Sequence, residues 1–291
     1  MSTNSVWVDS ETGRLRRVVI GSPHTFVLPE PINQKQREWL TDESLRPTRE
    51  RLIPEFQSFQ SALEDHGVEV IVPEPVDGVP DQLTPRDIGV VISDVFVRMR
   101  MATSCRANEW RGIERIIQAL PESSYLVVPD TAVLEGGDVV VDQNFIFVGT
   151  GERSNEEGVA FLHERFGDRY EVIQVPLRGE SHGEDILHLD CAFVPLGKGK
   201  ALIYPDGMAQ IPDAIRDTYD WIEVTKAEQQ ILSTNVLSLD SQTVISRSAA
   251  TRINETLREH GLDVIEIVFA DTPKSGGSFR CASLPLNRDA P

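Results

Sequence analysis

Three segments of the sequence carry side chains that can act as a nucleophile, a base and an acid. They read LEGGDVV, LHLDCAF and SGGSFRCASLPL, and each lies at the edge of an apolar run. Cys281 is a candidate nucleophile, because His188 can serve as its base and Glu135 as the acid that orients the base. The alternative for Cys281 is a buried small hydrophobic residue, the common state of a free cysteine. These residue types indicate catalysis through a thiolate.

Carboxylates dominate the other candidates in these segments: Asp87 in PRD, Glu135 and Asp138 in EGGD, and Asp190 in HLD. Several acids around one pocket repel each other unless a cation or a proton lies between them. A guanidinium fits this description, because it is planar, stays charged and pairs with carboxylates through two hydrogen bonds. Its central carbon is an electrophile that a thiolate can attack. EGGD is equally compatible with a tight turn that opens a strand.

His188 and Asp190 are two residues apart in HLD. If this segment is a strand, alternation places both side chains on the same face. A histidine and a carboxylate aimed at one cavity suit proton transfer beside a bound cation. The alternative is a histidine whose ring hydrogen-bonds a backbone carbonyl.

A repeated unit must position these side chains. An apolar strand, a turn, a second strand, a helical stretch and a third strand recur five times, most clearly in GVVISDVFVRMR, RANEWRGIERIIQAL and SYLVVPD. The first copy, from LRRVVIGSP to VEVIVPE, and the fourth are looser. Such units bury their apolar faces by stacking, and stacking around an axis brings the connecting loops together at one end. We therefore expect one α/β domain over residues 1–291, with its chemistry in those loops.

Two segments stand outside the repeat. The residues before Leu15 are predicted to form a short arm. The stretch from Leu28 to Pro47 is polar and contains several prolines, which predicts a surface loop or flap. Loops of this kind often cover active sites.

Composition excludes several classes of protein. The formal charge of −18 argues against binding a nucleic-acid backbone, and it suits either attraction of a cationic substrate or simple solubility. No apolar run approaches the roughly 18 residues of a membrane span, and MSTNSVWVDS lacks a secretory signal. A cytoplasmic location without membrane contact is expected. Three cysteines without paired spacing indicate neither a disulfide framework nor a zinc site.

Several motifs together resemble a known group of enzymes. PRD ending at Asp87, EGGD from Glu135, GERSN from Glu152, HLD from His188 and GGSFRC ending at Cys281 are similar to the motifs of the guanidino-modifying superfamily. Arginine deiminase, dimethylarginine dimethylaminohydrolase and glycine amidinotransferase are members. The likeness runs from LRRVVIGSP to PLNRD. It implies a five-bladed α/β propeller, or pentein, built of ββαβ repeats with pseudo-fivefold symmetry.

The resemblance also implies roles for the site residues. Cys281 would form a thiouronium-type covalent intermediate, with His188 as general acid and base. Glu135 would support His188 and bind the guanidinium, and Asp87 and Asp190 would clamp its nitrogens. The resemblance implies neither a metal nor an organic cofactor.

Two arginines bear on the substrate. Arg106 and Arg153 match positions at which arginine deiminase holds the substrate α-carboxylate, which favours a free amino acid. Asp81 stands where the deiminase has an asparagine. We therefore predict a hydrolase of L-arginine or an N-substituted arginine that leaves citrulline and releases ammonia or an alkylamine.

Two alternatives stay open. MRMATSCRANEW and ILSTNVLSLD resemble the transferase, so one alternative is an amidinotransferase that moves the amidino group to an amine. The other is a non-catalytic binding protein on the same propeller. A small guanidino molecule is the expected partner in the leading interpretation. The sequence leaves the oligomeric state open, a homo-oligomer included.

Overall fold

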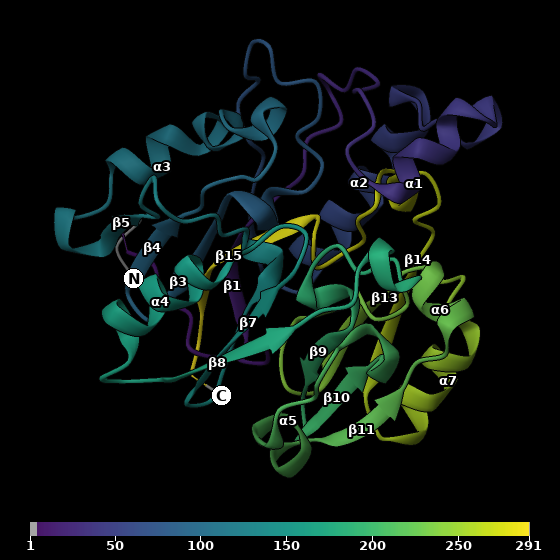
Figure 1. Cartoon of the computed structure of the whole chain (residues 1–291). Coiled ribbons are helices and arrows are strands. Elements are labelled where there is room, and N and C mark those ends of the chain that lie inside the picture. Colours follow the sequence, from purple (N-terminus) through teal and green to yellow (C-terminus); the bar gives the residue numbers. More distant parts are fainter. Residues whose placement is uncertain (1–4, 291) are drawn as a thin grey trace.

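The computed structural model describes residues 5–290, and within them the strands form five three-stranded sheets. In every sheet the middle strand pairs antiparallel with one neighbour and parallel with the other. Figure 1 shows these sheets along the chain. The α/β class and the order of elements within each unit are as predicted.

Four of the sheets are each built from consecutive strands. Their bounds are β3 (Gly89–Ile92), β4 (Val95–Arg98), β5 (Tyr125–Val127); β6 (Val139–Asp142), β7 (Phe145–Thr150), β8 (Glu171–Pro176); β9 (Phe193–Leu196), β10 (Lys200–Ile203), β11 (Asp220–Glu223); β12 (Leu237–Ser238), β13 (Thr243–Arg247), β14 (Asp263–Ile267). The order in space matches the order in sequence because each antiparallel pair is joined by a short turn.

The remaining sheet uses both ends of the chain. It contains β1 (Leu15–Ile20), β2 (Glu69–Ile71) and β15 (Ser283–Arg288), in the order β15-β1-β2. The antiparallel partner of the first predicted strand therefore lies near the C-terminus. This explains why the first copy of the repeat looks incomplete in the sequence.

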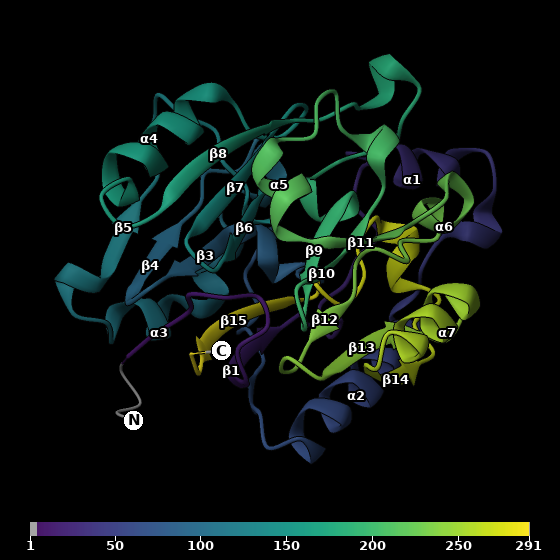
Figure 2. The same cartoon turned by 90° about the horizontal axis from the view of Figure 1, so that it is seen from below.

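One helix of each unit connects the second and third strands. These helices are α2 (Arg49–Asp65), α3 (Glu114–Gln118), α4 (Glu156–Phe166), α5 (Asp213–Thr218) and α7 (Thr251–Glu259). Figure 2 shows α2, α3, α4 and α7 towards the outside, with β6, β9, β12 and β15 nearer the middle. Each helix buries an apolar stripe; in α7 this comprises Ile253 and Leu257. Gly261, at φ +79°, follows α7 where an end to the helix was predicted.

Turns before the first strand of a sheet carry the polar residues found in the motifs. The 3₁₀ turns η3 (Pro85–Ile88), η7 (Gly136–Asp138) and η9 (Leu189–Cys191) precede β3, β6 and β9. Asn235 and Cys281 occupy the corresponding places before β12 and β15. Since η3 contacts η7 and η7 contacts η9, the repeat brings distant motifs side by side.

Residues 5–14, which belong to the predicted short arm, pack against the domain. Val6 and Val8 are buried in an apolar cluster with Leu284 and Leu286. The amide of Trp7 donates to the Leu286 carbonyl, and that of Val8 donates to the Ser93 carbonyl. The segment packs there because its alternating apolar residues cover the otherwise open side of the neighbouring strands.

The predicted flap, residues 28–47, contains short helical turns. They are α1 (Gln34–Arg37), η1 (Glu38–Leu40) and η2 (Glu43–Leu45). Asn33 caps α1 by accepting a hydrogen bond from the Gln36 amide at 2.9 Å. Asn33 and Gln36 also donate to the Ser275 carbonyl, at 3.1 and 3.2 Å, so the flap is tied to the segment before Cys281. A further helix, α6 (Lys226–Gln230), separates β11 from β12. Among residues 5–290, no helix has the length and apolarity required to span a bilayer.

Candidate active site

One pocket gathers side chains from all the predicted segments. It is lined by Ile32, Asn33, Gln36, Asp81, Thr84, Asp87, Arg106, Glu135, Arg153, Leu187, His188, Ser275, Gly276 and Cys281. The flap residues among them confirm that this segment covers the pocket. The enclosed cavity measures about 20 Å³, which is room for roughly one water molecule. A larger ligand therefore requires the flap to move.

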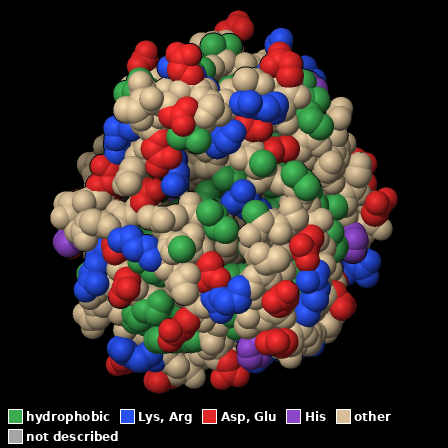
Figure 3. Space-filling view, turned by 90° about the vertical axis from the view of Figure 1, so that its right-hand side faces the viewer, with side chains coloured by type: hydrophobic (Ala, Val, Ile, Leu, Met, Phe, Trp, Pro, Cys, Tyr) green, Lys and Arg blue, Asp and Glu red, His purple; other side chains and the backbone are tan. Residues whose placement is uncertain are grey.

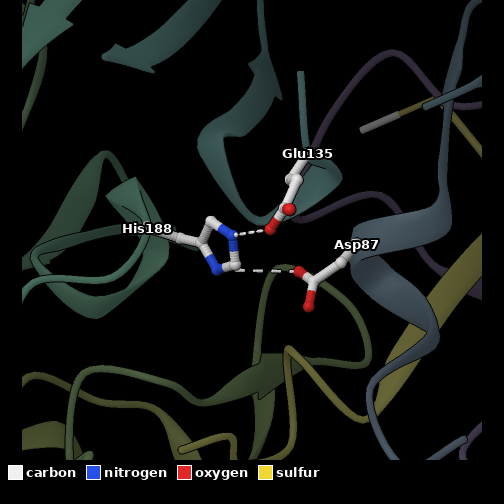
Figure 4. Close-up of side chains that lie close together, drawn as sticks. All are labelled: Asp87, Glu135 and His188. Atoms are coloured by element: carbon white, nitrogen blue, oxygen red, sulfur yellow. Dashed lines mark hydrogen bonds and ion pairs between the residues drawn. The ribbon is translucent and has the colours of Figure 1, made fainter. Parts of the chain in front are cut away.

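His188 lies between two carboxylates. Its Nε2 is 2.7 Å from Glu135 Oε2, and its Nδ1 is 3.7 Å from Asp87 Oδ1 (Figure 4). Burial alone would lower the pKa of His188, but Asp87, Asp138 and Glu135 raise it to about 10. The ring is therefore an imidazolium at neutral pH, and its Nδ1 proton faces Asp87.

Arg106 holds Asp87 in place. Its Nη1 donates to Asp87 Oδ2 at 2.6 Å, its Nη2 to the Thr84 carbonyl at 3.0 Å and its Nε to Glu109 Oε2 at 2.8 Å. Burial opposes ionisation of Asp87, but His188 and Arg106 lower its pKa below the ordinary value. To contact a substrate carboxylate, as predicted, Arg106 would have to give up one of these hydrogen bonds. The geometry favours Arg106 as a positioning residue for Asp87.

Glu109, behind Arg106, was not predicted. Burial raises its pKa to about 8 despite the neighbouring guanidinium. Its Oε1 has no hydrogen-bond partner among the described residues. Its Oε2 lies 2.8 Å from both Nε and Nη2 of Arg106, so Glu109 orients the guanidinium that holds Asp87.

Glu135 is joined to both the flap and the backbone. The Ala102 amide donates to Glu135 Oε1 at 2.8 Å, and Arg153 Nη1 lies 3.9 Å from the same oxygen. Arg153 Nη2 donates to the carbonyl of Ile32 in the flap at 2.5 Å. Arg153 therefore connects the closed flap with an acid of the pocket.

The glycines of EGGD permit this close packing. A Cβ on Gly136 would lie 2.0 Å from the Arg86 carbonyl oxygen. One on Gly137 would lie 2.7 Å from His188 Cγ and 2.8 Å from Asp87 Oδ1. EGGD is thus a tight turn, as one alternative held, and it also delivers Glu135 to the pocket.

Cys281 is held at the wall of the pocket by Asn235. Asn235 Oδ1 accepts hydrogen bonds from the Cys281 amide at 3.1 Å and the Ser278 amide at 3.2 Å. Cys281 Sγ lies 3.5 Å from Asp190 Oδ2. Burial and the charge of Asp190 raise the pKa of the Cys281 thiol well above its ordinary value. Burial and the neighbouring carboxylate therefore oppose ionisation of this thiol.

Asp190 and Asp138 are not among the residues that line the pocket. The expected strand alternation in HLD is wrong, because Leu189–Cys191 is a 3₁₀ turn. Asp190 instead pairs with Arg280 at 2.9 Å. Asp138 accepts hydrogen bonds from the Leu189 amide at 2.9 Å and Ser154 Oγ at 2.6 Å, and burial raises its pKa to about 7. Both acids shape the turns beneath the pocket.

A second set of buried charges lies behind Cys281. We call Glu11, Arg86, Asp190, Arg280 and Arg288 the arginine cluster. Arg280 donates to Glu11 Oε1 at 2.8 Å, to Asp190 Oδ2 at 2.9 Å and to the Val139 carbonyl at 3.0 Å. Although burial opposes it, Arg280 and Arg86 lower the pKa of Glu11 to about 2. Glu11 comes from the segment predicted to be an arm.

The acids of the pocket could also coordinate a metal. Ligand atoms of Asp87, Glu135 and His188 all lie within 4.8 Å of one another. Arg106 pairs with Asp87, and Arg153 lies beside Glu135. A divalent ion would compete with these guanidinium groups, whereas a planar cation can share the acceptors with them. The donor set therefore fits a guanidinium better than a metal.

Comparisons with known proteins agree with this geometry. A family model described as N,N dimethylarginine dimethylhydrolase, eukaryotic, matches residues 22–288. The uncharacterised protein YkgA of Bacillus subtilis is 33% identical over 287 residues, covering 96% of this chain and 94% of that protein. The N(G),N(G)-dimethylarginine dimethylaminohydrolase of Streptomyces coelicolor is 26% identical over 238 residues, covering 80% and 85%.

Two solved structures share the fold. The amidinotransferase SxtG of Microseira wollei superposes with a TM-score of 0.82 at 21% identity, covering 98% of each chain. Dimethylarginine dimethylaminohydrolase of Pseudomonas aeruginosa superposes with a TM-score of 0.80 at 18% identity, covering 94% of this chain and 99% of that one. The chain belongs to the dimethylarginine dimethylaminohydrolase family within the guanidino-modifying superfamily. It is an enzyme of the group that also contains arginine deiminases and amidinotransferases.

Proposed function

We propose that this protein hydrolyses the guanidinium group of L-arginine or an N-substituted arginine. The products are citrulline and either ammonia or an alkylamine, and the five sheets are the blades of a pentein propeller. Asp87 Oδ1 carries the proposal: this buried oxygen has no hydrogen-bond partner among the described residues and faces His188 at 3.7 Å. A guanidinium nitrogen supplies the missing donor, and its positive charge is attracted to the neighbouring carboxylates.

Two residues suit the amino-acid end of the substrate. Arg153 lines the pocket and donates to the flap carbonyl of Ile32, so it can exchange this partner for a carboxylate when the flap opens. Asp81 also lines the pocket, and it is a candidate acceptor for an α-ammonium group. Burial raises the pKa of Asp81 despite the charge of Arg106. An ammonium group would restore its ionisation.

The first half-reaction consumes the guanidinium. The bound cation lowers the pKa of the Cys281 thiol, and the thiolate attacks the central carbon to form a C–S bond. The C–N bond to the departing amine then breaks, and His188 gives this nitrogen a proton. Asp87 and Glu135 stabilise the positive charge that stays on the thiouronium-type intermediate.

Water completes the reaction. Neutral His188 removes a proton from the attacking water as a C–O bond forms at the same carbon. The C–S bond breaks, the remaining hydroxyl proton of the attacking water is transferred to the Cys281 sulfur, and the carbon leaves as the urea group of citrulline. The proton that the Cys281 thiol lost before its attack passes to solvent, so each cycle restores the thiol and releases one proton.

Product analysis tests the proposal. Purified protein is incubated with L-arginine, with or without glycine or lysine, and the products are identified by mass spectrometry. Citrulline with ammonia supports hydrolysis, whereas ornithine that forms only with an acceptor supports an amidinotransferase. If arginine gives no product, methylarginines are tested next. Absence of turnover and binding with all of these substrates would favour a non-catalytic binding protein.

The Arg153 assignment has its own test. Arg153→Ala should raise KM about tenfold and leave kcat within a few-fold, because it removes a contact to the unreacting end of the substrate. Arg100→Ala is the matched control, since Arg100 is exposed and pairs with exposed Asp130. An unchanged KM in Arg153→Ala would remove the carboxylate role.

A further inference from the structure

A second pocket lies beside the flap, outside the catalytic site. Its cavity measures about 160 Å³ and is larger than the catalytic cavity. One wall belongs to the flap, with Lys35 and Trp39; another belongs to η11 (Thr272–Ser275), with Lys274. Figure 3 views the side of the molecule on which α1, α6 and α7 lie, where lysine and arginine side chains stand among apolar ones.

The charge of this pocket differs from that of the protein. The chain has a formal charge of −18 and five lysines, and two of these, Lys35 and Lys274, line the pocket together with Arg247. Glu38 is the acid of the lining and lies 3.5 Å from Lys35. Lys274 pairs with Asp271 at 2.8 Å, and Asp271 is shared with Arg51. A basic recess on an acidic protein favours an anionic ligand.

The other lining groups indicate that the ligand also has an apolar part. Trp39 is 1% exposed and adds an aromatic ring to the lining. Leu45, Ile231 and Pro273 provide apolar walls. A ligand with one anionic group and a compact apolar body matches these contacts.

Both walls continue directly into the catalytic pocket. Lys35 lies between Asn33 and Gln36, and these two residues line the catalytic pocket and donate to the Ser275 carbonyl. Lys274 is followed by Ser275 and Gly276, which line it as well. A ligand that contacts Lys35 and Lys274 together therefore holds the flap against η11.

We propose that the pocket between the flap and η11 binds a small apolar carboxylate and thereby stabilises the closed flap. The binding itself is independent of the catalytic reaction. Only its effect on substrate entry rests on the proposed function. Because coupling is reciprocal, the carboxylate and the substrate must change each other's affinity by the same factor.

Calorimetric titration of the full chain with benzoate tests the binding. Benzylamine serves as the ring of opposite charge and inorganic phosphate as the anion without a ring. We expect benzoate to bind with a Kd on the order of 1 mM, and benzylamine and phosphate at least tenfold more weakly. Equal binding of all three probes, or no binding of benzoate, would overturn the proposal.

Variants locate the site. The double variant Lys35→Gln and Lys274→Gln should weaken benzoate at least tenfold, and Trp39→Phe about threefold. Lys226→Gln is the matched control, because Lys226 on α6 contacts Gly183 and Glu184 outside the pocket. Asp87→Asn removes an acid of the catalytic pocket that bonds Arg106 and faces His188, and it should leave benzoate binding unchanged. A change in benzoate affinity in Asp87→Asn would place benzoate in the catalytic pocket and contradict the proposal.

The coupling is measured in the Cys281→Ser variant, which retains substrate without turnover. L-arginine is titrated with and without saturating benzoate, and a change of at least threefold in its Kd is expected. Arginine that fails to bind would count against the proposed function, while the benzoate titration would still decide the second site. Arginine that binds with the same Kd in both titrations would contradict the closing of the flap.

Discussion

The catalytic pocket and the arginine cluster are both buried and charged, yet their charges are balanced differently. In the cluster, Glu11 accepts hydrogen bonds from Arg280, and its pKa falls to about 2. In the pocket, the acids Asp81, Asp87 and Glu135 equal the cations Arg106, Arg153 and His188 in number, but their hydrogen-bonding capacity is not filled. Burial raises the pKa of Asp81, and Asp87 Oδ1 has no partner among the described residues.

This difference separates structural charge from functional charge. The acids of the cluster are satisfied by the chain itself, so the cluster contributes to the folded state. The pocket leaves an acceptor, Asp87 Oδ1, without a donor among the described residues, and under the proposed function a guanidinium substrate would supply it. Asp190 lies on the boundary, because its Oδ2 contacts both Arg280 and Cys281 Sγ.

The largest expected effect is loss of the nucleophile. Cys281→Ser should reduce turnover by at least ~10⁴-fold, since the covalent intermediate cannot form efficiently, while thermal stability stays close to that of the wild type. Citrulline formation and thermal unfolding are measured. Cys105→Ser is the control, because Cys105 is exposed. Substantial remaining activity in Cys281→Ser would refute the nucleophile assignment.

Glu11→Gln should act on folding. It removes the charge that compensates Arg280, and breaking a buried ion pair costs about 3–5 kcal/mol of unfolding free energy. Chemical denaturation measures this loss, and kcat/KM is compared at a temperature at which the variant is folded. Wild-type stability, or a loss of activity without a loss of stability, would break the distinction between the two regions.

Asp87→Asn should act on catalysis. It keeps the shape of the side chain and removes the acceptor charge for the guanidinium, so kcat/KM should fall by about 10²–10³-fold. Unfolding free energy should change less than in Glu11→Gln, because Asp87 also repels the nearby carboxylates of Asp81 and Glu109, and Arg106 keeps its pair with Glu109. Steady-state kinetics and denaturation of the two variants are compared directly. The reverse pattern would assign the structural role to Asp87.

The dependence of the unfolding free energy on pH in the acidic range tests the comparison further. The pKa of Glu11 in the folded protein, about 2, lies below its ordinary value of 4.5. Its contribution is therefore complete above about pH 4.5 and is lost as pH falls towards 2. The loss amounts to about 3 kcal/mol of unfolding free energy. Denaturation from pH 6 to pH 2 should show a shallower decline in Glu11→Gln, and parallel curves would contradict it.

The smallest effect concerns the thiol in the free enzyme. Because burial and Asp190 raise the pKa of Cys281 well above its ordinary value, little thiolate should be present at pH 8 without substrate. The absorbance difference at 240 nm between wild type and Cys281→Ser, followed as pH rises, reports the thiolate. An inflection near pH 7 would show that the pocket already carries the compensating cation.

The repeat made most of the fold predictable. Alternating apolar strands and the helices 114–118, 156–166 and 251–259 fall where the sequence indicated. The partner of β1 could not be found in this way, because β15 lies at the other end of the chain and pairing depends on closure of the whole domain. The alternation expected in HLD failed because η9 has a helical rather than an extended backbone.

The site was predictable to a similar extent. Motif resemblance led to Cys281, His188, Glu135 and Asp87, and the structure places all four in one pocket. Glu11 and Arg280 carry no local signal, since they pair across 269 positions of sequence. Asn235 could have been found from the repeat. It lies two residues before the first strand of its sheet, as Asp87 does in another sheet.

The sheet β15-β1-β2 has a consequence for synthesis of the protein. The strand that completes it, Ser283–Arg288, follows Cys281 by one residue and is among the last parts of the described chain to be translated. While this strand is still inside the ribosome, a nascent chain has neither a closed sheet nor Cys281 in its pocket. Closure of the domain and placement of Cys281 therefore depend on the same late segment of the chain.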